Sequence, residues 1–195
     1  MGKSIVSMIA AVVCLVSLIS GCTLHLVPSK IPPLDTKTEG IAGPFRNVTV
    51  TLINAQSDDA NYSVKDLKGK DTGYVLSRKL WTEKLAEALG AELTARQGKV
   101  VENAPITISL TITDVVYEMK TVGALWNIQF DATARVSSNS GWTKTYVGKG
   151  DSAAAVPGGF SGDSNWNRAA IWTIRDVMLA IMSDPEFVTK LQKRK

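Results

Sequence analysis

Histidine and cysteine are almost missing from this 195-residue chain. The only histidine is His25, and the two cysteines, Cys14 and Cys22, both lie near the amino terminus. Beyond them the chain can form no Ser-His-Asp triad, no Cys-His pair and no metal site with His or Cys ligands. The net charge is only +4, too small and too scattered to predict a nucleic-acid partner. We therefore expect no catalytic residues, no metal and no cofactor.

The amino terminus has the three parts of a secretory signal peptide. Lys3 supplies the basic start, an apolar run continues to Ile19, and the small residues Ser20 and Gly21 follow. A transmembrane helix is the alternative, but it needs ~20 apolar residues, more than this run contains. The prediction is a signal peptide over residues 1–21.

The tetrad Ile19-Ser20-Gly21-Cys22 resembles the lipobox of bacterial lipoproteins. In that family the chain is cut before the cysteine, here between Gly21 and Cys22. The thiol is then diacylated and the new amino terminus acylated, which implies stable membrane anchoring at Cys22 and no disulfide in the mature protein. Thr23, where retained lipoproteins often have Asp, implies export to the periplasmic face of the bacterial outer membrane.

The segment after the lipobox is rich in proline and has no sustained apolar period. This composition predicts a flexible tether over residues 22–44, with a typical span of ~25 Å. The alternative is that part of it packs on the domain as an extended strip, which Ile31, Leu34 and Ile41 favour. The rest of the chain, residues 45–195, has the length of a single domain.

Hydrophobic periodicity predicts the secondary structure of this domain. Alternating residues predict strands near 48–52, 106–119, 128–136 and 142–150, with a bulge at Val115-Val116. Apolar residues at helical spacing predict helices from Tyr74 or Ser77 to Ala95 and from Asn165 to Met182, and Asp184-Pro185-Glu186 begins a short last helix. The polar residues 54–73 are predicted to form a loop, and the glycine-rich residues 152–163 a mobile connection rather than a phosphate-binding loop.

These elements predict an α+β fold in the order β-α-β-β-β-α, followed by the short C-terminal helix. The expected architecture is an antiparallel sheet of about four strands with two helices packed on one face. An exposed edge strand of such a sheet would permit a homo-oligomer.

Three short stretches resemble the YajG-type family of small bacterial lipoproteins. They are Ser77-Arg78-Lys79-Leu80, Leu93-Thr94-Ala95-Arg96, and the closing region 170–191 with Asp184 and Phe187. The resemblance implies a non-enzymatic protein and transfers no catalytic residue to this chain.

The leading functional hypothesis is a binding or accessory subunit of a protein complex in the cell envelope. Trp126 lies two residues before the strand predicted to begin at Ile128, and Trp172 widens the apolar face of its predicted helix. We expect both tryptophans to be candidates for partner contact.

Two other functional classes remain open at this point. A lipid or amphiphile carrier could line a groove with tryptophans, namely Trp81, Trp126, Trp142, Trp166 and Trp172. A cell-wall hydrolase would need two convergent carboxylates. The residues that could supply them are Asp114, Glu118, Asp131 and Asp151.

Overall fold

The computed structural model describes residues 24–35, 39, 41, 44–57, 61–65, 68–122, 125–155 and 162–192. The elements are β1 (Leu24–His25), β2 (Thr49–Asn54), β3 (Asn61–Lys65), β4 (Asp71–Ser77), α2 (Arg78–Ala95), β5 (Lys99–Val100), β6 (Ile106–Val122), β7 (Leu125–Ser138), β8 (Thr143–Ala155), α3 (Gly162–Met182) and α4 (Pro185–Gln192). In this described part of the chain, no helix combines the length and the apolarity needed to cross a bilayer.

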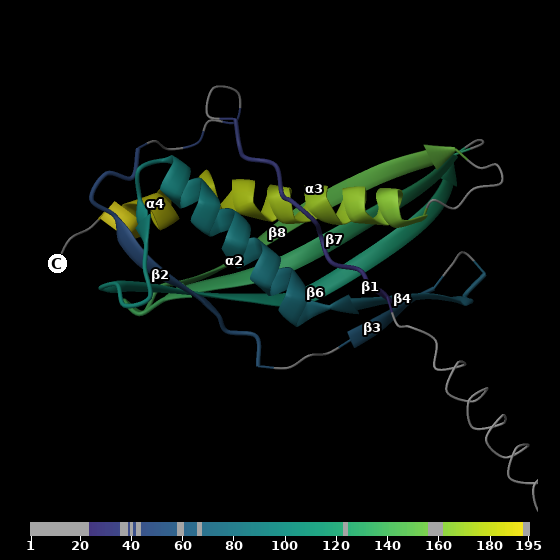
Figure 1. Ribbon diagram of the computed structural model, residues 1–195, viewed down its shortest axis with the longest axis horizontal. Helices are drawn as coiled ribbons and strands as arrows, with labels where there is room; N and C mark the ends of the chain where they lie inside the picture. The colour runs from purple at the N-terminus through teal and green to yellow at the C-terminus, as the bar shows by residue number, and fades with distance from the viewer. Residues whose placement is uncertain are drawn as a thin grey trace, which may run out of the picture.

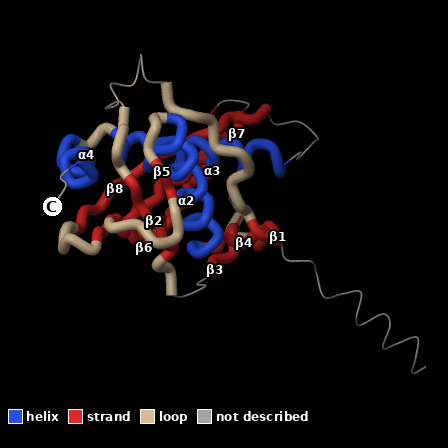
Figure 2. Tube along the Cα trace, turned by 60° about the vertical axis from the view of Figure 1, so that its left-hand side comes forward, coloured by secondary structure: helices blue, strands red, loops and turns tan. Residues whose placement is uncertain are grey.

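The strands form a five-stranded sheet in the order β5-β2-β6-β7-β8 and a three-stranded sheet in the order β1-β4-β3. Helix α2 packs over β2 and β6, and α3 packs over β7 and β8 (Figure 1). Figure 2 shows the two long helices running beside the strands, with α4 at one end of the molecule. The α+β class is confirmed, and both long helices pack on the larger sheet.

The prediction of a purely antiparallel four-stranded sheet was wrong. Strands β6, β7 and β8 form the expected antiparallel meander, but β2 runs parallel to both β5 and β6. The reason lies in the connection, because α2 carries the chain back across the sheet between β2 and β6. A strand that is followed by such a helical crossover pairs in parallel with the next strand.

The predicted loop over 54–73 contains β3 and the first part of β4. In β3 only Val64 is buried, so the strand lacks the alternating apolar pattern by which a strand is recognised. Tyr74 belongs to β4, and α2 therefore begins after Ser77, the later of the two predicted starts. Strand β4 pairs with β3 on one side and β1 on the other in a separate small sheet at one end of the molecule (Figure 1).

Helix α2 has a satisfied backbone at both ends. The hydroxyl of Ser77 accepts a hydrogen bond from a backbone N–H three residues later, at 3.2 Å, which makes it the N-cap. At the other end Gln97 adopts a left-handed φ of 70°, and the N–H of Gly98 donates to the carbonyl of Leu93. This pattern is a Schellman ending, and α2 continues through Gly90 to reach it.

The meander strands differ from their prediction in two details. Strand β8 continues to Ala155, into the segment predicted to be a mobile connection. The bulge predicted at Val115-Val116 lies instead at Thr113, where the register with β7 shifts between Ile112 and Asp114. The extra residue rotates the strand so that the alternation of buried positions resumes with the first of the two valines.

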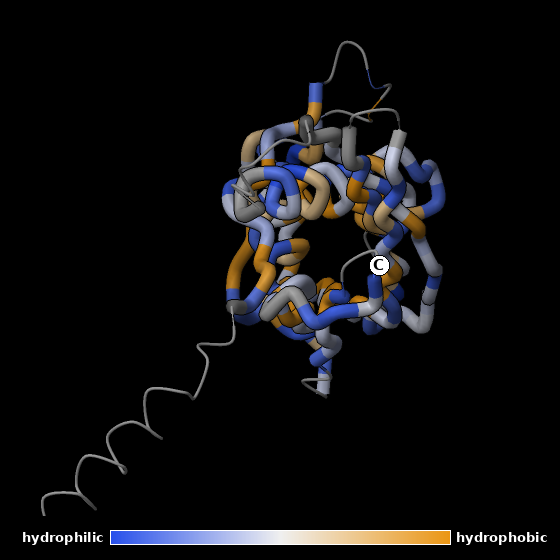
Figure 3. The backbone as a smooth tube through the Cα atoms, turned by 90° about the vertical axis from the view of Figure 1, so that its right-hand side faces the viewer, coloured by the Kyte–Doolittle hydropathy of each residue, from blue (hydrophilic) through white to orange (hydrophobic). Residues whose placement is uncertain are grey.

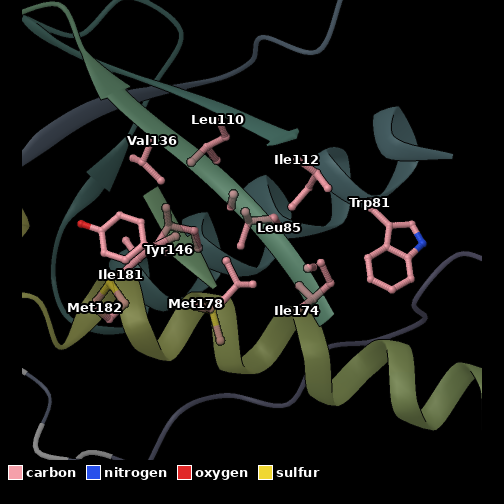
Figure 4. Packing of buried hydrophobic residues seen from close by; sticks show 14 of the residues in the cluster. Trp81, Leu85, Leu110, Ile112, Val136, Tyr146, Ile174, Met178, Ile181 and Met182 are labelled. Atoms are coloured by element: carbon pink, nitrogen blue, oxygen red, sulfur yellow. The ribbon is translucent and has the colours of Figure 1, made fainter. Parts of the chain in front are cut away.

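The hydrophobic core lies between the five-stranded sheet and the two long helices. The predicted apolar face of α2 is fully buried there: Trp81, Leu85, Leu89 and Leu93. Figure 4 shows side chains of α2 and α3, including Ile174 and Met178 of α3, packed against the central strands. The strand residues in this contact include Leu110, Ile112 and Val136. In a view along the long axis, the sheet and the helices surround this hydrophobic core (Figure 3).

The tether predicted over 22–44 is bound to the domain at many of its described residues. We call the described residues 24–35, 39 and 41 the strap. Leu26, Leu34 and Ile41 of the strap are buried in the core. The alternative interpretation, an extended strip on the domain surface, is therefore what the structure contains, and these apolar side chains are the reason.

Hydrogen bonds tie the strap to both long helices. On α2, the indole N–H of Trp81 donates to the carbonyl of Leu26 at 2.8 Å. On α3, Asn167 exchanges two hydrogen bonds of 3.0 Å with Ser29, and Arg175 pairs with Glu39 at 2.7 Å. The strap thus links α2 to α3.

Candidate functional site

The residues predicted for lipidation, and the side chain of one tryptophan, fall outside the described part of the structure. Gly21 and Cys22 lie before its first residue. The backbone of Trp126 occupies the second position of β7, opposite Thr121 of β6, but its side chain lies outside the described part. The predictions for these three residues stay predictions.

Trp172 lies on α3 with 43% of its surface exposed. The guanidinium of Arg175 stands over its ring, 5.3 Å from the centroid. The same arginine pairs with Glu39 of the strap and donates a hydrogen bond to the carbonyl of Pro33. Trp172 therefore lies beside the strap, and Arg175 contacts both. The exposed part of the Trp172 ring is available for contact with a partner.

The other described tryptophans belong to the core. Trp81 and Trp166 are fully buried, and both pack against the ring of Phe130, at centroid distances of 5.4 and 5.7 Å. Trp142 is also buried and packs on Phe187 of α4. A groove lined by all the tryptophans is therefore wrong for this chain, since Trp81 and Trp166 are fully enclosed in the core.

A cleft of about 1010 Å³ lies where α4 meets the end of the larger sheet. We call it the α4 cleft. Its apolar lining includes Ile106, Ile108, Trp142, Phe187 and Leu191, and its polar lining includes Arg46, Asn47, Asn139 and Lys190. An apolar lining with a few charged and amide groups is typical of sites that bind small molecules.

An N-cap interaction fixes α4 as one wall of this cleft. Asp184 Oδ1 accepts a hydrogen bond from the N–H of Glu186 at 3.0 Å, which confirms the predicted helix start. Its other oxygen accepts from the hydroxyl of Tyr146 at 2.6 Å and lies 3.0 Å from the ammonium of Lys144. Both partners come from β8, so Asp184 joins α4 to the sheet.

The same contacts shift the pKa values of this group of residues. Burial by itself would raise the pKa of Asp184, but the hydrogen bonds from Tyr146, Lys144 and the Glu186 backbone together lower it. Burial raises the pKa of Tyr146 strongly, and the neighbouring Asp184 adds to the effect. The carboxylate is thus held in its charged form and the phenol in its neutral form.

Replacing Tyr146 with phenylalanine should lower the free energy of unfolding by about 1–2 kcal/mol at pH 7, because a hydrogen bond to a charged group is lost. The folded pKa of Asp184 lies below its unfolded value of about 3.9, so this stabilisation is present above that pH. It is lost as the pH falls through the folded pKa. Urea unfolding at several pH values should therefore show the difference shrinking below about pH 4. A difference that stays constant into acid would contradict the role of Asp184.

The four carboxylates considered for hydrolysis lie on the solvent side of the meander. Asp114, Glu118 and Asp151 are exposed, and Asp131 pairs with Lys149 at 2.9 Å. Partial burial acts to raise the pKa of Asp131, but the hydrogen bonds from Lys149 and Gln129 lower it. A general acid needs a raised pKa. The lowered pKa of Asp131 instead fits a carboxylate that links β7 to β8 through its ion pair with Lys149.

Metal-binding groups are equally scarce in the described ranges. Among those residues, no three side chains of the His, Cys, Asp and Glu types come together in a way that could hold a metal ion.

Sequence reasoning missed the α4 cleft. Its lining comes from the turn before β2, the start of β6, the turn between β7 and β8, and α4. These four segments are far apart in the sequence, and none carries a motif of its own. Only the predicted short last helix, which begins at Asp184-Pro185-Glu186, belongs to this region.

Comparisons with known proteins identify no family for the chain: no family model and no curated protein matches it. Among solved structures, it is similar to a minor lipoprotein from Acinetobacter baumannii, with 12% identity, a TM-score of 0.43, and coverage of 78% of this chain and 99% of the other. It is also similar to a Xanthomonas campestris protein of family DUF330, with 11% identity, a TM-score of 0.46, and coverage of 87% and 92%. At these scores no residue role is transferred.

Proposed function

We propose that this protein is a lipoprotein of the bacterial outer membrane that acts as a non-enzymatic binding or accessory subunit of an envelope complex. The observation that carries the proposal is the tetrad Ile19-Ser20-Gly21-Cys22 at the end of an apolar run behind Lys3. Its position is where a signal peptide is cut. Membership of the YajG-type family is part of the same proposal and rests on the short stretches of sequence described above.

Two properties of the domain support a binding role over an enzymatic one. The sequence beyond His25 offers neither histidine nor a free thiol, the side chains most used as bases and nucleophiles. The four carboxylates considered for hydrolysis are exposed or, in the case of Asp131, engaged in an ion pair. By contrast, the domain presents an exposed aromatic residue, Trp172, next to the strap.

In-cell crosslinking followed by mass spectrometry tests this function. The tagged protein is compared with Cys22→Ser, and with Trp172→Ala beside Arg168→Ala, a control on an exposed position one helical turn earlier. We expect one envelope complex, recovered with the wild type and the control, depleted with Cys22→Ser and with Trp172→Ala. Loss of the cation–π contact costs only about 0.5–1 kcal/mol at an exposed site, so Trp172→Ala should keep nearly the same melting temperature.

Recovery of only scattered, abundant envelope proteins would contradict the accessory role. Equal recovery with Trp172→Ala would remove Trp172 from the contact surface, and the same substitution at Trp126 would then test the other candidate. A large loss of stability in Trp172→Ala would mean that the side chain serves packing.

The α4 cleft favours a second candidate function, the binding of a lipid or other amphiphile. Its apolar floor suits an acyl chain, and Arg46 and Lys190 suit an anionic head group. Mass spectrometry of molecules that co-purify with the Cys22→Ser protein distinguishes this role. A bound amphiphile that is lost in Lys190→Glu but kept in Lys79→Glu, an exposed lysine on α2, would favour it.

A further inference from the structure

The first strand of the domain begins two residues after the proposed lipid attachment point. Only Thr23 separates Cys22 from Leu24, the first residue of β1. Two residues of fully extended chain reach only ~7 Å. The flexible tether predicted for this segment would have let the domain stand off at ~25 Å and turn freely.

Hydrogen bonds and burial hold β1 firmly in the domain. Leu24 and His25 pair with Tyr74 and Val75 of β4. Directly afterwards, Leu26 donates its N–H to the carbonyl of Val75 at 2.8 Å, and its carbonyl accepts from the indole of Trp81. Its side chain is only 5% exposed, so the chain cannot lengthen here without losing core contacts.

The three-stranded sheet containing β1 lies at one end of an elongated domain, and α4 lies at the other (Figure 1). The hydroxyl of Tyr117, near the carboxyl end of β6, accepts a hydrogen bond from the N–H of Lys65 in β3. The α4 cleft is lined by Ile106, the first residue of the same strand. Ile106 and Tyr117 are eleven residues apart in β6, so the cleft and the contact with β3 are separated by roughly 36 Å along the strand.

We propose that the β1-β4-β3 sheet is the face of the domain that lies against the lipid surface, and that the α4 cleft points away from it into the aqueous space. The proposal rests on the proposed lipidation of Cys22. The strap then serves to orient the domain, because it ties the chain to α2 and α3 immediately after the anchor. Ligands or partners of the cleft approach from the side opposite the membrane.

Head-group quenching measures this orientation. The mature chain has no thiol besides the lipidated Cys22, so Lys65→Cys in β3 and Lys190→Cys in α4 each introduce one labelling site. Both replace an exposed lysine. The lipidated variants carry a thiol-linked fluorophore and are reconstituted in phosphatidylethanolamine–phosphatidylglycerol vesicles that contain a lipid with a nitroxide on its head group.

We expect quenching several-fold stronger at position 65 than at position 190. A matched variant carries twelve glycine and serine residues inserted between Thr23 and Leu24, a linker with a typical span of ~19 Å. In that variant, quenching at position 65 should fall towards the value at position 190. Equal quenching at both positions in the unmodified chain, or stronger quenching at position 190, would overturn the orientation.

Failure of the proposed function has a different signature. A wild-type protein that does not float with vesicles, and whose Cys22 carries no acyl group by mass spectrometry, would refute lipidation and this orientation with it. A protein that floats and is acylated, but shows no difference between the two labels, would refute the orientation alone.

Discussion

Replacing Gly150 with alanine is expected to lower the free energy of unfolding by about 3 kcal/mol. A Cβ atom at this position in β8 would lie 2.6 Å from Thr173 Oγ1, and closer still to the backbone N of Thr173 and the carbonyl oxygen of Ala169. Two of these atoms are helix backbone, which cannot move aside as a side chain tip can. The substitution must therefore push α3 away from the sheet.

Contacts around Gly150 explain why this displacement is costly. Gly148, two residues earlier on the same face of β8, meets α3 just as closely, with Thr173 O 2.7 Å from an added Cβ. The hydroxyl of Thr173 also donates to backbone carbonyls of α3 and β7, those of Ala169 and Phe130. Moving the helix would open the core along β8 and break the link to β7.

Gly90→Ala is the matched control, and it is expected to raise the free energy of unfolding instead of lowering it. Gly90 lies in the interior of α2, and an added Cβ would meet the half-buried side chain of Leu52 at 3.3 Å. That side chain can shift by a few tenths of an ångström, while alanine favours the helix by up to about 1 kcal/mol. Urea unfolding followed by tryptophan fluorescence measures both variants. A neutral Gly150→Ala would contradict the close approach of α3 to β8.

Replacing Arg96 with methionine should cost about 3–5 kcal/mol of folding stability, because a buried charge loses its partner. Arg96 Nε lies 2.5 Å from Glu92 Oε1, and both side chains are only 5% exposed. The second carboxylate oxygen of Glu92 accepts the N–H of Leu34 in the strap, at 3.2 Å. Arg96→Met therefore leaves a buried carboxylate facing the strap.

A double variant separates the lost ion pair from other effects of the substitution. Glu92→Gln removes the charge and keeps an oxygen that can accept the N–H of Leu34. In the double variant with Arg96→Met, much of the lost stability should return, since replacing both members of a buried pair is often nearly neutral. The exposed pair of Lys84 and Glu87, 2.7 Å apart, is the control, and Lys84→Met should change stability by less than about 1 kcal/mol. Strictly additive effects of the two substitutions at 92 and 96 would refute the coupling.

Several elements could be predicted from local patterns alone. The four-residue spacing from Trp81 to Leu93 predicted the buried face of α2, and Asp184 before Pro185 predicted the start of α4. The alternating residues of the meander predicted β6, β7 and β8. Such patterns are sufficient because the period of a helix or a strand depends only on which face of that element is buried.

The candidate sites divide in the same way. The predicted lipobox is a contiguous motif, so the sequence predicts its position at Cys22 without any need for tertiary structure. Trp172 was proposed from the width of its helix face and is exposed in the structure. The carboxylates Asp114, Glu118, Asp131 and Asp151 share the outer side of the sheet, but their environments, and the ion pair of Asp131, depend on neighbouring strands.

Other features depended on contacts between residues far apart in the sequence. Strand β3 has a single buried side chain, Val64, so its pairing comes from backbone hydrogen bonds to β4 that no hydrophobic period records. The strap contains prolines typical of a tether, yet Leu26 and Leu34 find a core surface that exists only after α2 and α3 have packed. The parallel placement of β2, the contact of Gly150 with a helix backbone and the α4 cleft arise in the same way. Each is a property of surfaces brought together by folding, and the free energy of those contacts is absent from any local stretch of the chain.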